Sequence, residues 1–192
     1  MMPENTLSSS AIYSAFLVPD KYDFLVDYEW GGVDLLDTSQ GLSVYIWKCF
    51  YADDWIQITN DHLTHKLIQV VNVKELSLAF DFNMHATIVY VAENADKTRD
   101  THLYWYDTAQ GKQITTLYGQ GYHSPQLSLD DQRLHQSANA DIIFAYIKNG
   151  DLYYRQQRDR FTIEYLLSAV NEAVTLKQIG MNTKNRFQFV FW

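Results

Sequence analysis

Apolar side chains recur at every second position in several parts of this sequence, and that period belongs to a β-strand. The pattern is clearest over residues 187–192, 42–47 and 161–165. Successive side chains of a strand point to opposite faces, so each stretch predicts a strand with one apolar face. Three further runs consist mainly of β-branched and aromatic residues and show no alternation. Such runs suit strands that are covered on both faces. These runs are residues 86–91, 102–106 and 142–147.

Turn residues separate these strands at short intervals. Asn149-Gly150 lies between two of them and is the strongest hairpin signal in the chain, because both residues accept positive φ. Three further pairs are expected to turn the chain in the same way: Gly31-Gly32, Asp53-Asp54 and Gln110-Gly111. The sequence therefore predicts an all-β protein of antiparallel sheets.

A faint repeat suggests how the sheets are organised. Residues 76–78 and 127–129 both spell Leu-Ser-Leu, and each copy leads into an apolar strand and then an aromatic one. About four strands in a unit of about 50 residues match the blade of a β-propeller. The alternative is that these similarities are of the kind that any strand-rich chain shows and do not reflect a repeat.

The domain prediction follows from the length and from this repeat. At about 150 residues per domain, a chain of 192 residues predicts one β-rich domain over 21–192, preceded by an extended N-terminal arm over 1–20. Within the domain we expect about three β-modules that resemble propeller blades, over residues 21–72, 73–121 and 122–192. They would form an open array, or partner subunits would cover its ends.

Few short helices are expected. Asn60-Asp61 could cap a turn or two of helix that carries apolar residues as far as Val71. Residues 168–175 are a weaker second candidate.

Composition and charge exclude several classes of protein. Hydrophobic residues make up 47% of the chain and charged residues 20%, which excludes a disordered chain. The net charge of −8 argues against a nucleic-acid partner and against an anionic membrane surface. The single cysteine, Cys49, allows no intrachain disulfide and favours a reducing compartment. No signal peptide or spanning segment is expected, so we predict a protein made in a cytoplasm.

The sequence predicts no catalytic residue, no metal site and no cofactor. The glycines near Gly111 and Gly119 fail the phosphate-loop and dinucleotide patterns. His62 and His65 lack further ligands apart from Asp61. The paired acidic residues 53–54 and 130–131 are adjacent, so on a strand they would point apart, whereas a glycosidase needs two facing carboxylates. The expectation is that the protein is not an enzyme.

Aromatic and arginine residues supply the candidates for an interaction surface. Aromatic residues make up 15% of the chain, including 14 Tyr and 5 Trp. Tryptophan in such proteins fills the core or an interface, or stacks on sugar rings. The one basic cluster follows the Asn149-Gly150 hairpin and suits a solvated strand end or a polar contact with a neighbouring subunit. The candidate interface residues are Arg155, Arg158, Arg160, Trp30 and Trp55.

Two stretches carry a resemblance to a known family. Residues 140–161 run Ala-Asp-Ile-Ile-Phe-Ala-Tyr-Ile-Lys-Asn-Gly-Asp-Leu-Tyr-Tyr-Arg-Gln-Gln-Arg-Asp-Arg-Phe, and residues 176–182 run Leu-Lys-Gln-Ile-Gly-Met-Asn, followed by Asn-Arg-Phe-Gln-Phe at 185–189. Together they resemble a family of small virion structural proteins of tailed bacteriophages, most clearly over residues 127–189.

The resemblance implies a structural component of the tail or of the neck, where head and tail connect. It implies copies of itself in a ring and other virion proteins as partners, and a virion location after assembly in the cytoplasm of a host bacterium. It supplies no catalytic residues. The alternative function is a carbohydrate-binding, receptor-recognising module with a propeller-like fold, for which the dispersed tryptophans would be the sugar-stacking residues.

Overall fold

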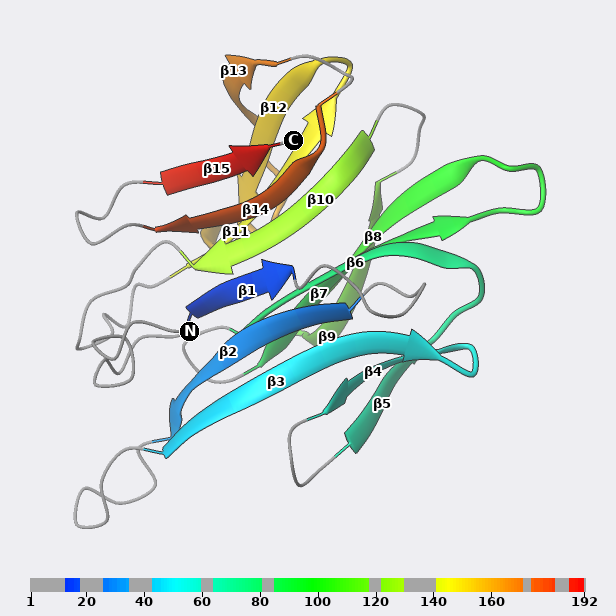
Figure 1. The fold of residues 1–192 in the computed structure, drawn as a ribbon, viewed down its shortest axis with the longest axis vertical. Helices are drawn as coiled ribbons and strands as arrows, with labels where there is room; N and C mark the ends of the chain where they lie inside the picture. The colour runs from blue at the N-terminus through cyan, green and yellow to red at the C-terminus, as the bar shows by residue number, and fades with distance from the viewer. Residues whose placement is uncertain are drawn as a thin grey trace.

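The computed structural model describes residues 13–17, 26–34, 43–59, 64–80, 85–117, 122–129, 141–170, 174–181 and 187–191. Nearly all regular structure in these ranges is β-strand, arranged in four antiparallel sheets (Figure 1). The helical structure in them is a short 3-10 turn, η1 (Gln157–Asp159). The prediction of an all-β protein of antiparallel sheets is confirmed.

Strands that are neighbours in sequence are neighbours in each sheet, so every sheet is a simple meander. Sheet A contains β1 (Tyr13–Leu17), β2 (Val26–Asp34), β3 (Ser43–Ala52), β4 (Trp55–Thr59) and β5 (Thr64–Gln69). Sheet B contains β6 (Val73–Phe80), β7 (Ala86–Glu93), β8 (Arg99–Asp107) and β9 (Gly111–Leu117).

Sheets C and D complete the described structure. Sheet C contains β10 (Tyr122–Leu129), β11 (Ile142–Lys148), β12 (Asp151–Gln156) and β13 (Tyr165–Ala169). Sheet D contains β14 (Leu176–Met181) and β15 (Phe187–Phe191).

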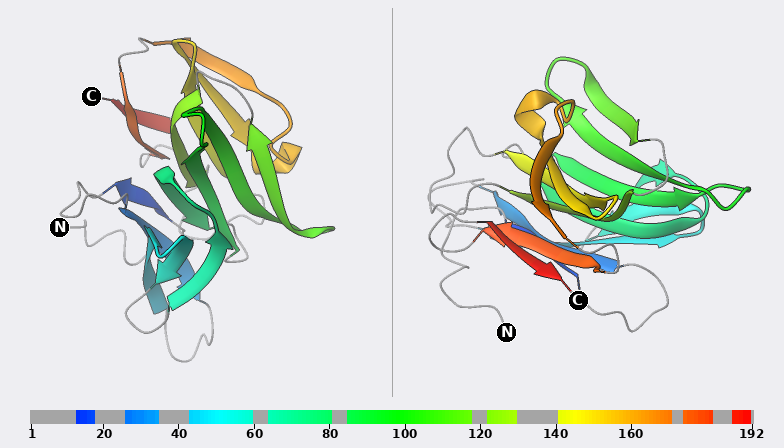
Figure 2. Two further views of the ribbon diagram at one scale, coloured as in Figure 1. Left: turned by 90° about the vertical axis from the view of Figure 1, so that its right-hand side faces the viewer. Right: turned by 90° about the horizontal axis from the view of Figure 1, so that it is seen from above.

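The sheets pack against one another near their first strands. β6 contacts both β2 and β10, β10 contacts β14, and β1 contacts β6, β10 and β14. Figure 2 shows sheet B lying between sheet A and sheet C. Successive meander sheets that meet at their first strands and end in outer strands resemble the blades of a propeller.

The core consists of two apolar clusters that share sheet C. The larger joins sheets A, B and C and includes Ile56, Leu78 and Phe144. The smaller joins sheets C and D and includes Ile143 and Ile179. β11 is therefore buried on both faces, because its successive residues contribute to different clusters. This explains why the sequence of β11 shows no alternation.

Turn chemistry was predicted well at some positions and wrongly at one. Asn149 (φ 53°) and Gly150 (φ 84°) join β11 to β12 in a tight hairpin, as predicted. Gly111 also has positive φ, at the turn between β8 and β9. The prediction for Gly31-Gly32 was wrong, since both lie inside β2 at a shift of register against β3. Glycine in a strand interior commonly marks such a bulge.

The helix predicted after Asn60-Asp61 was also wrong in the part that the structure describes. Residues 64–69 form β5, which pairs with β4 and places Ile68 opposite Ile56. Pairing with a neighbouring strand outweighs a weak helical spacing over so few residues. In the second candidate, 168–175, residues 168–169 end β13 and residues 171–173 lie outside the described residues.

The predicted arm, residues 1–20, is described only at 13–17. That segment is β1, which pairs antiparallel with β2. Across the described ranges, no helix has the length and apolar character needed to cross a membrane.

Candidate assembly surface

β13 is the outermost strand of sheet C, and its apolar side chains face solvent. Leu166 is 62% exposed and Leu167 is 45% exposed. Ile163, which lies just before the strand, is 48% exposed. Apart from the half-buried Tyr165, every residue of β13 is exposed, so both faces of the strand are open. No described strand pairs with its outer edge.

The outer strands of sheets A and B differ from β13 in charge. β5 exposes Lys66, and β9 exposes Lys112 beside the apolar Ile114. A lysine on an edge strand hinders pairing with a further strand, and natural sheets commonly use one for that purpose. β13 has the sequence Tyr-Leu-Leu-Ser-Ala, with no charged residue. Among these three outer strands, β13 is the one without a charge that would prevent pairing.

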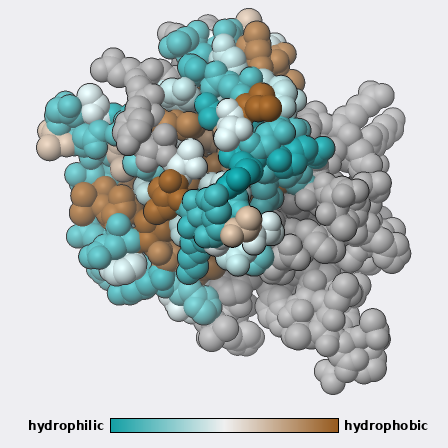
Figure 3. Space-filling view, turned by 180° about the vertical axis from the view of Figure 1, so that it is seen from behind, coloured by the Kyte–Doolittle hydropathy of each residue, from teal (hydrophilic) through white to brown (hydrophobic). Residues whose placement is uncertain are grey.

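Figure 3 shows the rear face of the molecule, where hydrophobic residues form patches separated by hydrophilic residues. Exposed large apolar residues are Val71, Ile114, Ile163, Leu166, Leu167 and Val190. Three of them belong to β13 and the segment that leads into it, and the other three occur singly on other parts of the chain. Isolated exposed apolar residues are ordinary, whereas the successive Leu166 and Leu167 expose apolar area along one edge strand.

The three arginines predicted as interface residues lie next to this strand but make ion pairs within the chain. Arg155, in β12, contacts Glu164 at 3.2 Å. Arg158, in η1, contacts Asp141 at 2.8 Å through Nε, and its backbone N–H donates to the same carboxylate. Arg160, just after η1, contacts Asp107 of sheet B at 2.7 Å.

These contacts fix the turn that leads into β13. The side chains of Arg158 and Arg160 remain about half exposed, whereas that of Arg155 is largely buried. Arg160 and Phe161 both adopt left-handed backbone conformations. Phe161 is buried against Trp105 of sheet B, with ring centroids 5.3 Å apart. The turn therefore anchors the outer half of sheet C to sheet B.

Glu164 anchors the start of β13 through hydrogen bonds from three side chains. The Lys148 ammonium donates to it at 2.8 Å, Arg155 donates at 3.2 Å, and the Tyr146 hydroxyl donates to the same carboxylate. Partial burial raises the pKa of Glu164, but the bonds from Lys148, Tyr146 and Arg155 outweigh burial and hold the pKa below its ordinary value. The charge of Glu164, next to the start of β13, is thus compensated within the chain.

A second polar contact ties sheets B and C together near their first strands. The Ser124 backbone N–H donates to Glu75 at 2.9 Å, and the Leu127 backbone N–H donates to the Ser77 hydroxyl at 3.1 Å. Burial raises the pKa of Glu75, and the bond from Ser124 and the charges of Arg99 and Lys177 only partly offset it. These bonds serve packing between sheets.

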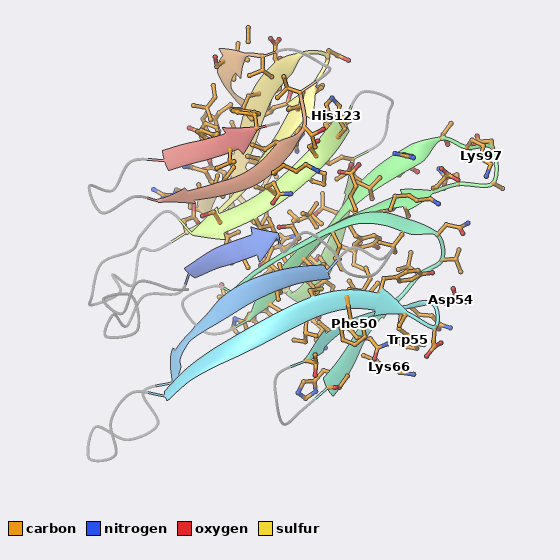
Figure 4. All side chains as sticks on the ribbon, viewed as in Figure 1. Phe50, Asp54, Trp55, Lys66, Lys97 and His123 are labelled. Atoms are coloured by element: carbon orange, nitrogen blue, oxygen red, sulfur yellow. The ribbon has the colours of Figure 1, made fainter. Side chains whose placement is uncertain are left out.

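The two tryptophans in the predicted interface set lie in sheet A. Trp30 is in β2, opposite Ile46 and Tyr13, and its side chain lies outside the described side chains. Trp55 begins β4 and is half-buried, with the Lys66 ammonium 5.6 Å from its ring centroid. Figure 4 shows Trp55 and Lys66 at one end of sheet A, whereas the arginines belong to sheet C, on the other side of sheet B. The structure brings the three arginines together but not the tryptophans with them.

Sequence reasoning missed Ile163, Leu166 and Leu167. The available signal was a run of residues, 165–170, with neither charge nor alternation. An edge strand that is exposed on both faces shows no period. The strand predicted over 161–165 was also wrong over 161–164, because these residues precede β13, with Phe161 buried and Ile163 exposed.

The arrangement offers a surface for protein contact. In the described part of the chain, no group of three or more His, Cys, Asp or Glu side chains could hold a metal ion. Comparison of the chain with protein-family models, with curated proteins and with solved structures found no match.

Proposed function

We propose that this protein is a structural component of the virion of a tailed bacteriophage, placed in the tail or neck and acting through protein–protein contacts. The observation that carries the proposal is the uncharged, apolar outer strand β13, exposed on both faces. Proteins that work by assembly use complementary surfaces, and an open sheet edge is such a surface.

The family resemblance supports the same proposal from the sequence. It is clearest over residues 127–189, a stretch that includes most of sheets C and D and the whole of β13. The part of the chain that resembles virion proteins is thus the part with the open edge.

Mass spectrometry of purified phage particles tests the proposal. The expected result is that peptides of this protein are found at a constant ratio to other virion proteins through successive purification steps. A non-virion protein of the same lysate, followed in parallel, is the control for contamination. Loss of the peptides together with that control would refute the proposal.

Carbohydrate binding by a receptor-recognising module is the second candidate. Trp55 favours it, because its ring remains partly accessible and lies beside Lys66, whereas Trp105 is buried. A glycan array of the intact protein, repeated with Trp55→Ala, tests this function. Binding that disappears in Trp55→Ala but persists in Ile114→Ala, a control for loss of exposed apolar area elsewhere, would favour it over assembly.

A further inference from the structure

We infer that β13 of one copy pairs antiparallel with β13 of a second copy, so that the two sheets C form one continuous sheet across a two-fold axis. The inference rests on the proposed function and names a partner for its assembly surface. It follows from the backbone, the charge and the side chains of this one strand.

The backbone of β13 offers hydrogen-bonding groups on its outer side. β12 pairs with its inner side, from Asp151 opposite Ala169 to Tyr154 opposite Tyr165. No described strand pairs with the outer side. Backbone N–H and C=O groups along a free edge are a template for another strand.

Charge favours a second copy at β13 over the outer strands of sheets A and B, and Leu166 and Leu167 are more exposed than Val190 on the uncharged edge strand β15. The molecule has a net charge of −8, so two copies repel each other in general. At a two-fold axis each residue approaches its own counterpart, and like charges directly opposite are destabilising. Pairing through β5 or β9 would bring Lys66 or Lys112 toward its counterpart.

At β13 no charge lies within the strand to meet its counterpart. Three carboxylates near the strand are paired with cations inside each copy: Glu164 with Lys148 and Arg155, Asp141 with Arg158, and Asp107 with Arg160. The hydroxyl of Tyr165 donates to Asp159 at 2.7 Å. The strand itself is therefore uncharged on an otherwise acidic protein.

The side chains provide the driving force for association. Leu166 and Leu167 lie on the strand, and Ile163 lies beside it, all largely exposed in the single chain. Pairing would remove part of this apolar area from water at about 25 cal/mol per Å². The register shift between Leu152 and Tyr153 leaves Leu167 as an additional residue in β13. Such a bulge twists an edge strand, so regular pairing with a second copy is confined to the few residues on either side of it. A two-fold contact also closes on itself, so assembly through this edge stops at the dimer.

The oligomeric state of the full chain tests the inference. Light scattering after size exclusion is expected to give the mass of a dimer for the native chain and that of a monomer for Leu166→Lys at the same concentration. Ile114→Lys, which places the same charge on the outer strand of sheet B, is expected to remain dimeric. Circular dichroism of each variant checks that it is folded.

Cysteine cross-linking gives a second measurement that does not depend on a disruptive variant. Single substitutions to Cys at positions 166 to 169, such as Ser168→Cys, are expected to yield a covalent dimer under mild oxidation at the position nearest the two-fold axis. Lys66→Cys on β5 is the control and is expected to stay monomeric on a denaturing gel. The native Cys49 is buried, so background cross-linking is low.

The outcomes separate the inference from the proposed function. A native chain that is monomeric at every concentration, or a dimer equally weakened by Leu166→Lys and Ile114→Lys, would overturn the inference. If such a protein is nevertheless found in purified particles, its structural role stands and β13 binds a different partner. If the dimer forms through β13 but particles lack the protein, the pairing stands and the virion role fails.

Discussion

Two buried or partly buried glutamates in this protein have pKa values displaced in opposite directions. Glu164 accepts bonds from two cationic side chains and a hydroxyl, and these hold its pKa below the ordinary value. Glu75 is mainly desolvated and accepts one bond from the Ser124 backbone, so its pKa lies above the ordinary value. The two residues should therefore respond to pH with opposite signs.

Glu164→Gln is expected to lower the free energy of unfolding at neutral pH by about 1–2 kcal/mol, because it weakens charge-assisted hydrogen bonds on a partly exposed carboxylate. The folded-state pKa is depressed, so the stabilisation is complete above the ordinary pKa and is lost as pH falls through the folded one. Urea denaturation at about pH 7 and about pH 3 should show the difference shrinking in acid.

Asp53→Asn is the matched control for this variant. It removes the same charge from an exposed turn, where asparagine tolerates the positive φ of that position. Its effect on stability should be small at both pH values. If Glu164→Gln lost the same amount of stability at both pH values, the electrostatic explanation would be contradicted.

Glu75→Gln is expected to stabilise the protein at neutral pH. Glutamine keeps an acceptor for the Ser124 N–H and removes the desolvation of a charged group. Below the ordinary pKa both states of the wild type bind the proton, so the advantage of glutamine grows as pH rises from the ordinary pKa to the raised folded-state pKa and is complete above it. Urea midpoints measured between about pH 3 and about pH 8 give the profile.

Glu75→Ala separates the charge of this side chain from its hydrogen bond. It leaves the Ser124 N–H without its acceptor and should lower stability by about 1–3 kcal/mol. Stabilisation by alanine as large as that by glutamine would show that the bond to Ser124 contributes nothing.

Among the elements, the hairpins depend on left-handed turn residues. Gly111 has φ +79° at the turn between β8 and β9, and a Cβ placed there would meet no atom within 4 Å. Gly111→Ala should therefore reduce stability by about 1–2 kcal/mol through backbone strain alone. Gly111→Asn, which adopts positive φ more readily, should lose less. Thermal unfolding of both variants checks the order, and equal losses would contradict it.

The elements that the sequence predicts correctly are those with a local cause. Asn149-Gly150 fixes its hairpin by its own φ preferences, and the apolar runs in β7 and β11 predict burial on both faces. The errors lie where pairing with a neighbouring strand decides. Residues 64–69 become β5 because β4 lies beside them, and the Gly31-Gly32 pair bends a strand that β3 holds together.

The candidate surface also combines features that the local sequence reveals with features that depend on the rest of the fold. The arginine cluster was visible in the sequence, but its ion pairs with Asp107 and Asp141 depend on residues far away in the chain. The exposure of Leu166 and Leu167 depends on β13 being the last strand of its sheet. A sequence pattern gives no information on which strand will be last.

At the scale of the whole molecule, one apolar cluster joins three of the four sheets. Cys49 of sheet A belongs to this cluster and is fully buried. We therefore expect its thiol to resist labelling in the native protein and to react only when the protein unfolds globally.

Thiol labelling at increasing urea, compared with far-UV circular dichroism, tests this cooperativity. The two transitions should coincide, and Lys66→Cys, which introduces an exposed thiol on β5, should react without urea. Labelling of Cys49 before the dichroism changes would show that sheet A opens alone.

Each sheet is made from one continuous stretch of the chain, and none of the described strands crosses from one sheet into another. Sheets B and C meet through side chains and through bonds such as that from Leu127 to Ser77, outside any shared strand ladder. A gene encoding such a fold can gain or lose a whole sheet by tandem duplication or deletion. The strand pairing of the remaining sheets would not change. Homologues of different length should then differ by complete meanders, inserted between the last strand of one sheet and the first strand of the next.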